Sequence, residues 1–345
     1  MKYNLLISKI TNIKLFIVKR GINISMTKKT IHSPYYYIVS RHLTLSDFGL
    51  KINGKIPNEK QFSSGKNSNM FLNFIEKTYN SALIIFSKYS NDYSNHLYTQ
   101  PQLFTILAAK IYLKTTYRGI IDILEPCNEI LKFLGLSKLP HYTTIQKFFE
   151  RLSDTQIKYL NDYLLLDHPE KSELIALDGT GHTSDYADKY YAQIRTKKRK
   201  GYTKNHITID VDTRMILHYG VSRGPKHDTK FALAAIRQTK KYNPHYILAD
   251  RAYDSEEIRK TINEEAKAFD QIPLKTRAKK GHYRINSSTI FRPKVYGRRM
   301  NVESVIFVIK QKFSGINFSR SENLCNKETK LKDVLYNIYR YIQIF

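Results

Sequence analysis

Three carboxylates in the second half of the chain are candidates for binding a divalent metal ion. Asp178 lies in the segment LDGT, Asp250 lies in DRAYDS, and Glu303 follows a long basic stretch. Mg²⁺ is bound in proteins by a few carboxylate oxygens and keeps coordination positions for water and substrate phosphate. Two such ions, roughly 3.5–4 Å apart, stabilise both the attacking and the leaving oxygen of a phosphoryl transfer. The trio therefore predicts a site for two Mg²⁺ ions, with Mn²⁺ able to substitute, that acts on a phosphodiester.

Two basic segments near these carboxylates predict contact with a polyanion. The interval between Asp270 and Glu303 contains no acidic residue, and its cations are Lys275, Arg277, Lys279, Lys280, Arg284, Arg292, Lys294, Arg298 and Arg299. The second segment, RTKKRKGYTK, covers 195–204 and includes Lys197, Lys198, Arg199 and Lys200. Lys and Arg side chains neutralise DNA phosphates, so both segments are expected on a DNA-facing surface.

The composition of the whole chain agrees with a nucleic-acid partner. The chain of 345 residues contains 57 Lys and Arg but only 30 Asp and Glu, which gives a formal net charge of +27. A protein this basic repels itself unless it meets a polyanion, and double-stranded DNA is the partner expected. No apolar run approaches the ~18 residues of a membrane-spanning helix. The two cysteines, Cys127 and Cys325, form no disulfide framework, which favours a reducing cytoplasm and, with DNA as partner, a nucleoid-associated protein.

Hydrophobic periodicity separates a helical region from a region of alternating strands and helices. Residues 99–166 predict three or four short helices, with Thr143 or Thr144 as an N-cap. Their arrangement resembles a helix-turn-helix with 143–152 as recognition helix, although an ordinary helical bundle carries equal weight. The expected division is a weakly patterned N-terminal extension over 1–97, a helical DNA-binding region over 98–168, and a catalytic domain over 169–345.

The region after residue 169 predicts the order strand, hairpin, helix, strand, helix, strand, helix. This order is typical of an α/β domain with a mixed sheet. Asp178 and Asp250 are expected to close two of the strands, where sites of open α/β sheets gather. Taken alone, each has a structural reading as a turn residue or helix cap at about even odds. Asp254 is expected to be such a cap, at the N-terminus of the helix that follows it.

The last predicted helix, RMNVESVIFVIKQKF (299–313), and the residues just before it resemble a known family, the DDE-type transposases of prokaryotic insertion sequences. Tyr296, Arg299, Glu303 and Lys310 fit the family's Y-x2-R-x3-E-x6-K pattern at every spacing. The blocks around the two aspartates resemble the family's first and second aspartate motifs. The resemblance is strong over about 172–315 and looser over 99–166, and it says little about 1–95.

The resemblance implies an RNase H-like catalytic domain with a mixed sheet, preceded by an all-α DNA-binding region. It implies that Asp178, Asp250 and Glu303 form the catalytic, metal-binding triad. It also implies that three further residues contact DNA phosphates near the cleaved end, namely Tyr296, Arg299 and Lys310. His182 and His227 are further candidates to line the site, although a lone histidine is more often structural.

The predicted function is that of a transposase that binds the terminal inverted repeats of its insertion sequence. It would cleave the element's end in a metal-dependent reaction and join that end to target DNA, acting as a homodimer when two ends are synapsed. One alternative is a catalytically decayed or co-opted DNA-binding protein. A nuclease on the same fold is another, and a ribosome-associated basic protein is disfavoured by the carboxylate trio.

Overall fold

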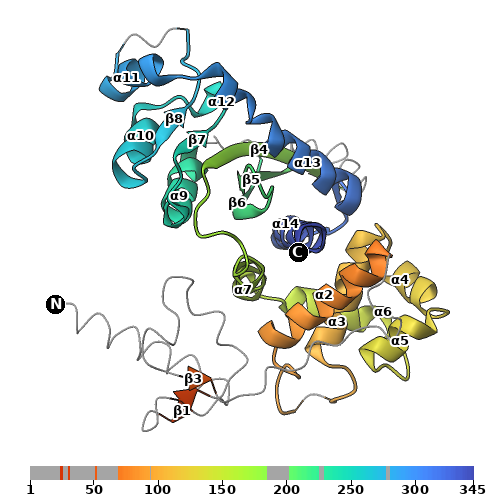
Figure 1. Cartoon of the computed structure of the whole chain (residues 1–345). Helices are drawn as coiled ribbons and strands as arrows, with labels where there is room; N and C mark the ends of the chain where they lie inside the picture. Colours follow the sequence, from red (N-terminus) through yellow and green to blue (C-terminus); the bar gives the residue numbers. More distant parts are fainter. Residues whose placement is uncertain are drawn as a thin grey trace, which may run out of the picture. The chain divides into compact units, whose positions relative to one another are not determined.

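The computed structural model describes residues 69–93, 95–184, 202–224, 229–276 and 280–345 (Figure 1). It also gives the backbone of three two-residue strands, β1 (Ile24–Ser25), β2 (Thr30–Ile31) and β3 (Lys51–Ile52). The chain forms two compact units. The helical unit comprises Met1–Ala109 and Tyr117–Leu166, and the sheet unit comprises Lys110–Thr116 and Asp167–Phe345. The predicted division at 97/98 and 168/169 stays a prediction.

The helical unit contains more helices than the sequence predicted for its range. Its described helices are α2 (Met70–Ile85), α3 (Gln100–Tyr112, whose end belongs to the sheet unit), α4 (Tyr117–Leu124), α5 (Asn128–Leu134), α6 (Tyr142–Arg151) and α7 (Asp154–Leu164). Three or four helices were expected over 99–166 and five are found. The extra one arises because Ser153 breaks the last predicted helix and caps α7 through a capping box with Gln156.

The predicted N-cap of α6 is wrong. His141, not Thr143 or Thr144, occupies the cap position, and no side chain caps the helix there. The Thr143 hydroxyl lies 2.8 Å from Nδ1 of His141 instead. The core of the unit is mostly aliphatic but includes aromatic contacts, such as that between the rings of Phe86 and Phe104, which lie 4.9 Å apart. Whether α6 is a recognition helix stays a prediction.

The sheet unit is built on one mixed sheet. Its strands are β4 (Leu174–Ser184), β5 (Tyr202–Asp210), β6 (Ile216–Arg223), β7 (Tyr246–Leu248), β8 (Phe269–Gln271) and β9 (Ile316–Asn317). Their order is β6-β5-β4-β7-β8, with β9 paired to β4. The predicted hairpin is β5–β6, which is antiparallel, whereas β7 runs parallel to β4 and β8 runs parallel to β7. The predicted mixed sheet is therefore confirmed, and its predicted strands appear in the expected order, whereas β9 was not predicted.

Helices cover both faces of this sheet. They are α9 (Thr229–Thr239), α10 (Glu256–Lys260) continued by a π-helix η5 (Thr261–Glu265), α11 (His282–Ile290), α12 (Pro293–Gly297), α13 (Met300–Phe313) and α14 (Glu322–Ile344), with 3-10 turns η3 (Lys240–Tyr242) and η4 (Arg251–Tyr253). Neighbouring residues of a strand point to opposite faces. On β5, Asn205 accordingly contacts Asp333 of α14, whereas His206 stacks on Phe231 of α9.

Candidate active site

The register of the central strands places Asp178 and Asp250 at the same level of the sheet. Leu174 of β4 pairs with Tyr246 of β7, so partners in this ladder are 72 positions apart. Asp178 and Asp250 are also 72 positions apart. The ladder itself ends at Leu248, and Asp250 follows as the N-cap of η4, where its carboxylate accepts a hydrogen bond from the amide of Ala252.

Asp178 does not close its strand, contrary to the prediction. It lies in the middle of β4, which continues to Ser184. The segment Gly179–Thr183 reads like a turn in sequence, but β5 pairs with it residue by residue and holds it extended. The Asp178 side chain is 18% exposed. Burial raises the pKa of its carboxyl above the usual range, and the charges of Asp250 and Glu303 add to this, against the Gly179 amide and Arg299.

Arg299 joins Asp178 to Glu303. Its guanidinium lies 3.2 Å from Oδ2 of Asp178 and also forms an ion pair with Oε1 of Glu303, one helical turn further along. Arg299 and Glu303, four residues apart, therefore lie on one face of the chain segment that leads into α13. Burial alone would lower the pKa of Arg299, but the hydrogen bond to Glu303 and the charge of Asp178 raise it. Arg299 is thus a permanent cation held between two carboxylates.

Aromatic rings lie beside Arg299. Its guanidinium carbon lies 5.9 Å from the centroid of the Tyr296 ring, within cation–π range. The Tyr296 ring in turn lies 5.4 Å from that of Phe291. Tyr296 belongs to the short helix α12, so the four-residue sequence pattern spans two helices rather than one.

The donor chemistry of this cluster fits a divalent cation, but its geometry does not yet form a ligand cage. Among the described residues, no group of three or more His, Cys, Asp and Glu side chains lies close enough to hold a metal ion. Carboxylates that share a site need a cation nearby, since like charges disfavour their ionised forms. Here Arg299 supplies that charge to Asp178 and Glu303. Metal binding by these carboxylates would therefore require Arg299 to release at least one of them.

The other candidates of the late helix and of β4 lie further along the same elements. Lys310 is two turns beyond Glu303 on α13, and its side chain packs near Gly315. His182 lies four residues beyond Asp178 on β4 and is completely buried. Burial, with the nearby charges of Lys332 and Lys310, lowers the pKa of His182 to about 3. His182 is therefore neutral at physiological pH, as expected of a structural histidine, and His227 lies outside the described residues.

The basic segments are described only in part. Lys197, Lys198, Arg199 and Lys200 lie outside the described residues, as do residues 277–279. In the interval between Asp270 and Glu303, Lys280, Arg292 and Lys294 are exposed, as is Arg298, which forms a 2.7 Å ion pair with Asp212. Most of the described cations of this interval thus face solvent, but Arg284 and Arg299 do not, because they are largely buried in ion pairs with carboxylates. A DNA-facing role stays a prediction.

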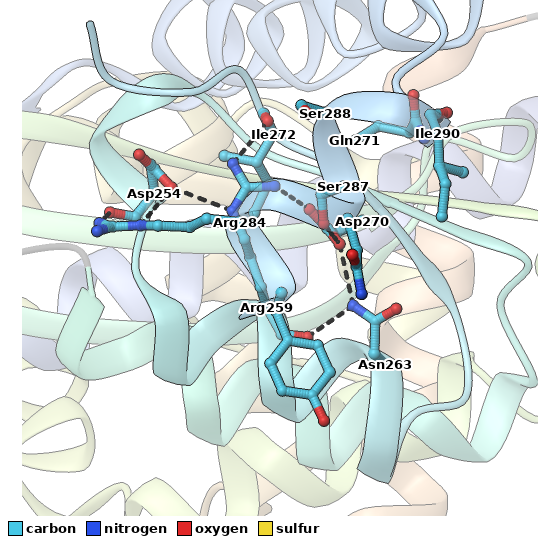
Figure 2. A network of polar contacts seen from close by, with 12 residues as sticks. Asp254, Arg259, Asn263, Asp270, Gln271, Ile272, Arg284, Ser287, Ser288 and Ile290 are labelled. Carbon is cyan, nitrogen blue, oxygen red and sulfur yellow. Dashed lines mark hydrogen bonds and ion pairs between the residues drawn. The ribbon is translucent and has the colours of Figure 1, made fainter. Parts of the chain in front are cut away.

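A buried ionic cluster fixes the loop that follows Asp250, and no sequence pattern pointed to it (Figure 2). The Arg259 guanidinium is fully buried and contacts Asp254 at 3.0 Å, Asp270, and the carbonyl oxygen of Ile272. The prediction that Asp254 caps a helix is wrong, because Ser255 occupies the cap position. Burial alone would raise the pKa of Asp254, but the Lys275 amide and Arg259 hold it below its usual range.

The same cluster attaches helix α11 to this loop. Arg284 of α11 donates to Oδ1 of Asp254 at 3.1 Å, and the Ser287 hydroxyl donates to Oδ1 of Asp270 at 2.6 Å. Figure 2 shows these side chains converging from α10, β8 and α11. Asp254, Asp270 and their arginine partners are therefore positioning residues for the segment that leads from Asp250 to Arg299. In the sequence, the only hint of this ionic cluster is that Asp270 is the last acidic residue before a long interval without any.

The central order β6-β5-β4-β7-β8, antiparallel on one side and parallel on the other, with helices on both faces, defines an RNase H-like domain. Comparison with known families agrees with this class. The family described as "Transposase DDE domain" matches residues 169–326, a stretch that contains Asp178, Asp250 and Glu303. Residues 169–326 are therefore similar to a transposase DDE domain. No match to a curated protein was found. None of the described helices is both long and apolar enough to cross a membrane.

Proposed function

We propose that this chain is a DNA transposase that cleaves the ends of its own insertion sequence and joins them to target DNA. The observation that supports this most directly is that Arg299 pairs with both Asp178 and Glu303, while the charge of Asp250 acts on Asp178, within the stretch 169–326 that matches the transposase DDE domain. Asp178 lies on β4, Asp250 follows the neighbouring parallel strand β7, and Glu303 is supplied by helix α13 from a distant part of the sequence. A structural role for any one of these residues alone would not explain why the charges of Asp250 and Glu303 both act on Asp178.

The three carboxylates would hold the divalent ions. When bound, Mg²⁺ or Mn²⁺ would stabilise the charge that develops on the attacking and leaving oxygens of an in-line displacement at phosphorus. The surrounding residues would position the DNA. Arg299 can grip a phosphate with two parallel donors, and Lys310 acts as a point charge on the same helix.

In the first reaction, the oxygen of a water molecule attacks the phosphorus at the element's end, a proton leaves that water, and the bond to the 3′-oxygen breaks. In the second, the freed 3′-hydroxyl attacks a phosphodiester of target DNA and displaces another 3′-oxygen. Because both are displacements at phosphorus, one site serves both. We further propose that the protein binds the terminal inverted repeats of its element and acts as a homodimer when two ends are paired.

The experiment is incubation of the full chain with Mg²⁺, a duplex that carries the element's end, and a target plasmid. Cleavage with joining of the cut 3′ end to the plasmid supports the transposase. Cleavage without joining would favour the nuclease on the same fold. Binding without cleavage, in Mg²⁺ and in Mn²⁺, would favour the decayed or co-opted DNA-binding protein.

A further inference from the structure

A cation-lined hollow lies on the sheet unit, away from the candidate active site. Its volume is about 620 Å³, and its charged lining side chains are Lys171, Arg237, Lys240, Lys241, Lys267 and Glu265. Five of these six charges are positive. The hollow thus differs from the candidate active site, where carboxylates gather.

The topology places this hollow where the parallel strands begin, whereas Asp250 lies where they end. Strands β4, β7 and β8 run parallel to one another, so they begin at a common edge. Lys171 precedes β4, His245 precedes β7, and Lys267 precedes β8, and all three line the hollow. Asp250 follows the other end of β7. The amino edge of the parallel strands is therefore basic, whereas their carboxyl edge carries Asp250.

The carboxylates nearby do not balance this charge. Arg237 makes two hydrogen bonds of 2.9 Å with Glu265, and Lys171 lies 2.7 Å from Glu173. All four of these side chains are at least one-third exposed, so the pairs are screened by water and hold the cations weakly. Lys240, Lys241 and Lys267 add three exposed positive charges. Like charges gathered in one hollow repel one another unless an anion joins them.

We propose that this hollow binds the phosphate backbone of a second segment of duplex DNA, distinct from the segment held at the candidate active site. The cations are spread over several elements and stay exposed, which suits contact with successive phosphates along a backbone. A site for one small phosphate would instead bring a buried cation or backbone amides to a single point. The proposal concerns binding, and it holds or fails independently of DNA cleavage.

A purely structural role for these cations predicts a different result. Arg237, Lys240 and Lys267 lie at or just beyond the C-terminal ends of α9 and η5, where positive charge stabilises a helix without any ligand. That role requires no contact with DNA. Lysine acetylation mapped by mass spectrometry, with and without DNA, therefore separates the two.

The test uses the full chain, without Mg²⁺, and a short random-sequence duplex as the probe. We expect the duplex to protect Lys240, Lys241 and Lys267 from acetylation. In Lys240→Gln/Lys241→Gln, the dependence of log K on log[salt] should become shallower by about 0.9 for each phosphate that is no longer neutralised. The matched control is Lys230→Gln/Lys260→Gln, which removes two exposed lysines from α9 and α10 and should change the dependence less.

Three results would overturn the proposal. If the duplex does not change the acetylation of these lysines, and Lys240→Gln/Lys241→Gln keeps the wild-type salt dependence, the cations have only a structural role. Protection by pyrophosphate but not by the duplex would make the hollow a small-anion site. An equal change of salt dependence in the control variant would show only the effect of general surface charge.

Discussion

Arg299 holds a position in which its charge and its geometry both matter. It lies between Asp178 and Glu303 and within cation–π range of the Tyr296 ring. If the carboxylates bind a divalent metal ion, as proposed, the guanidinium would be free to turn to a DNA phosphate. A lysine at this position would keep the charge and lose the two-donor geometry.

Arg299→Lys should therefore reduce Mg²⁺-dependent cleavage at least about tenfold, the rate equivalent of one hydrogen bond of about 1.4 kcal/mol. The salt dependence of DNA binding should stay nearly unchanged, because the charge is kept. The matched control is Arg223→Lys, since Arg223 also pairs with a glutamate, Glu322, at 3.0 Å. Wild-type cleavage by both Arg299→Lys and Lys310→Ala would mean that the Y-x2-R-x3-E-x6-K match is coincidental.

Asp333 of α14 gives a pH prediction that is independent of DNA. Burial raises the pKa of its carboxyl to about 8, despite a hydrogen bond from Asn205 and the nearby charge of Lys332. The folded state therefore keeps a proton that the unfolded state releases near pH 4, the usual range of an aspartate. From about pH 4 to about pH 8, this group makes the protein less stable as the pH rises, and above that range its effect is constant.

Asp333→Asn removes this titration and retains an oxygen that can accept from Asn205. The variant should be more stable than wild type at neutral pH, and its advantage should grow with pH by up to about 1.4 kcal/mol per unit. Urea unfolding of both proteins at about pH 5 and about pH 7 measures this. An advantage that is the same at both pH values would show that Asp333 is ionised in the folded protein.

At the scale of elements, the ionic cluster around Arg259 connects α10, β8 and α11. Removing its central cation leaves Asp254 and Asp270 buried without their main partner. Arg259→Met should therefore lower the free energy of unfolding by about 3–5 kcal/mol. Arg237→Met, which breaks an exposed pair with Glu265, should lower it by about 0–1 kcal/mol. Equal losses in urea unfolding would contradict the buried role of Arg259.

The sequence predicted those elements whose hydrophobic pattern is regular. The β5–β6 hairpin, α9 and α13 follow directly from alternation and helical periodicity. The full length of β4 could not be predicted in this way. Gly179 and Gly181 are typical turn residues, and only their pairing with β5 holds them extended. Helix α14 was not predicted either, since Lys332, Asp333 and Glu328 are buried on it and interrupt its apolar face.

In the candidate site too, contacts between residues close in sequence could be predicted, and contacts between distant residues could not. The approach of Arg299 to Glu303 follows from their spacing of one helical turn. Its approach to Asp178, which is 121 residues away, depends on how α13 packs on the sheet. The ionic cluster around Arg259 was missed for a related reason, because its charged residues look like surface residues until the fold buries them. Long-range packing is what the sequence pattern does not contain.

At the scale of the whole molecule, the net charge of +27 predicts DNA binding that depends steeply on salt. Replacing Lys197, Lys198, Arg199 and Lys200 together should flatten that dependence by about 0.9 for each phosphate that these residues neutralise. The loss of affinity should be equal for duplexes with and without the element's end, because phosphate contacts position a protein without specifying sequence. Fluorescence anisotropy across a salt series measures it. A loss confined to the specific duplex would instead assign base recognition to this segment.

The central claim is that Asp178, Asp250 and Glu303 act together as the catalytic carboxylates. The most direct measurement is Mg²⁺-dependent cleavage of the element's end by Asp178→Asn, Asp250→Asn and Glu303→Gln, with DNA affinity and melting temperature measured on the same samples. Each variant should lose cleavage while it still folds and binds the duplex, because only a carboxylate is replaced by its amide. Wild-type cleavage by any one of them, or loss of folding in all three, would contradict the claim.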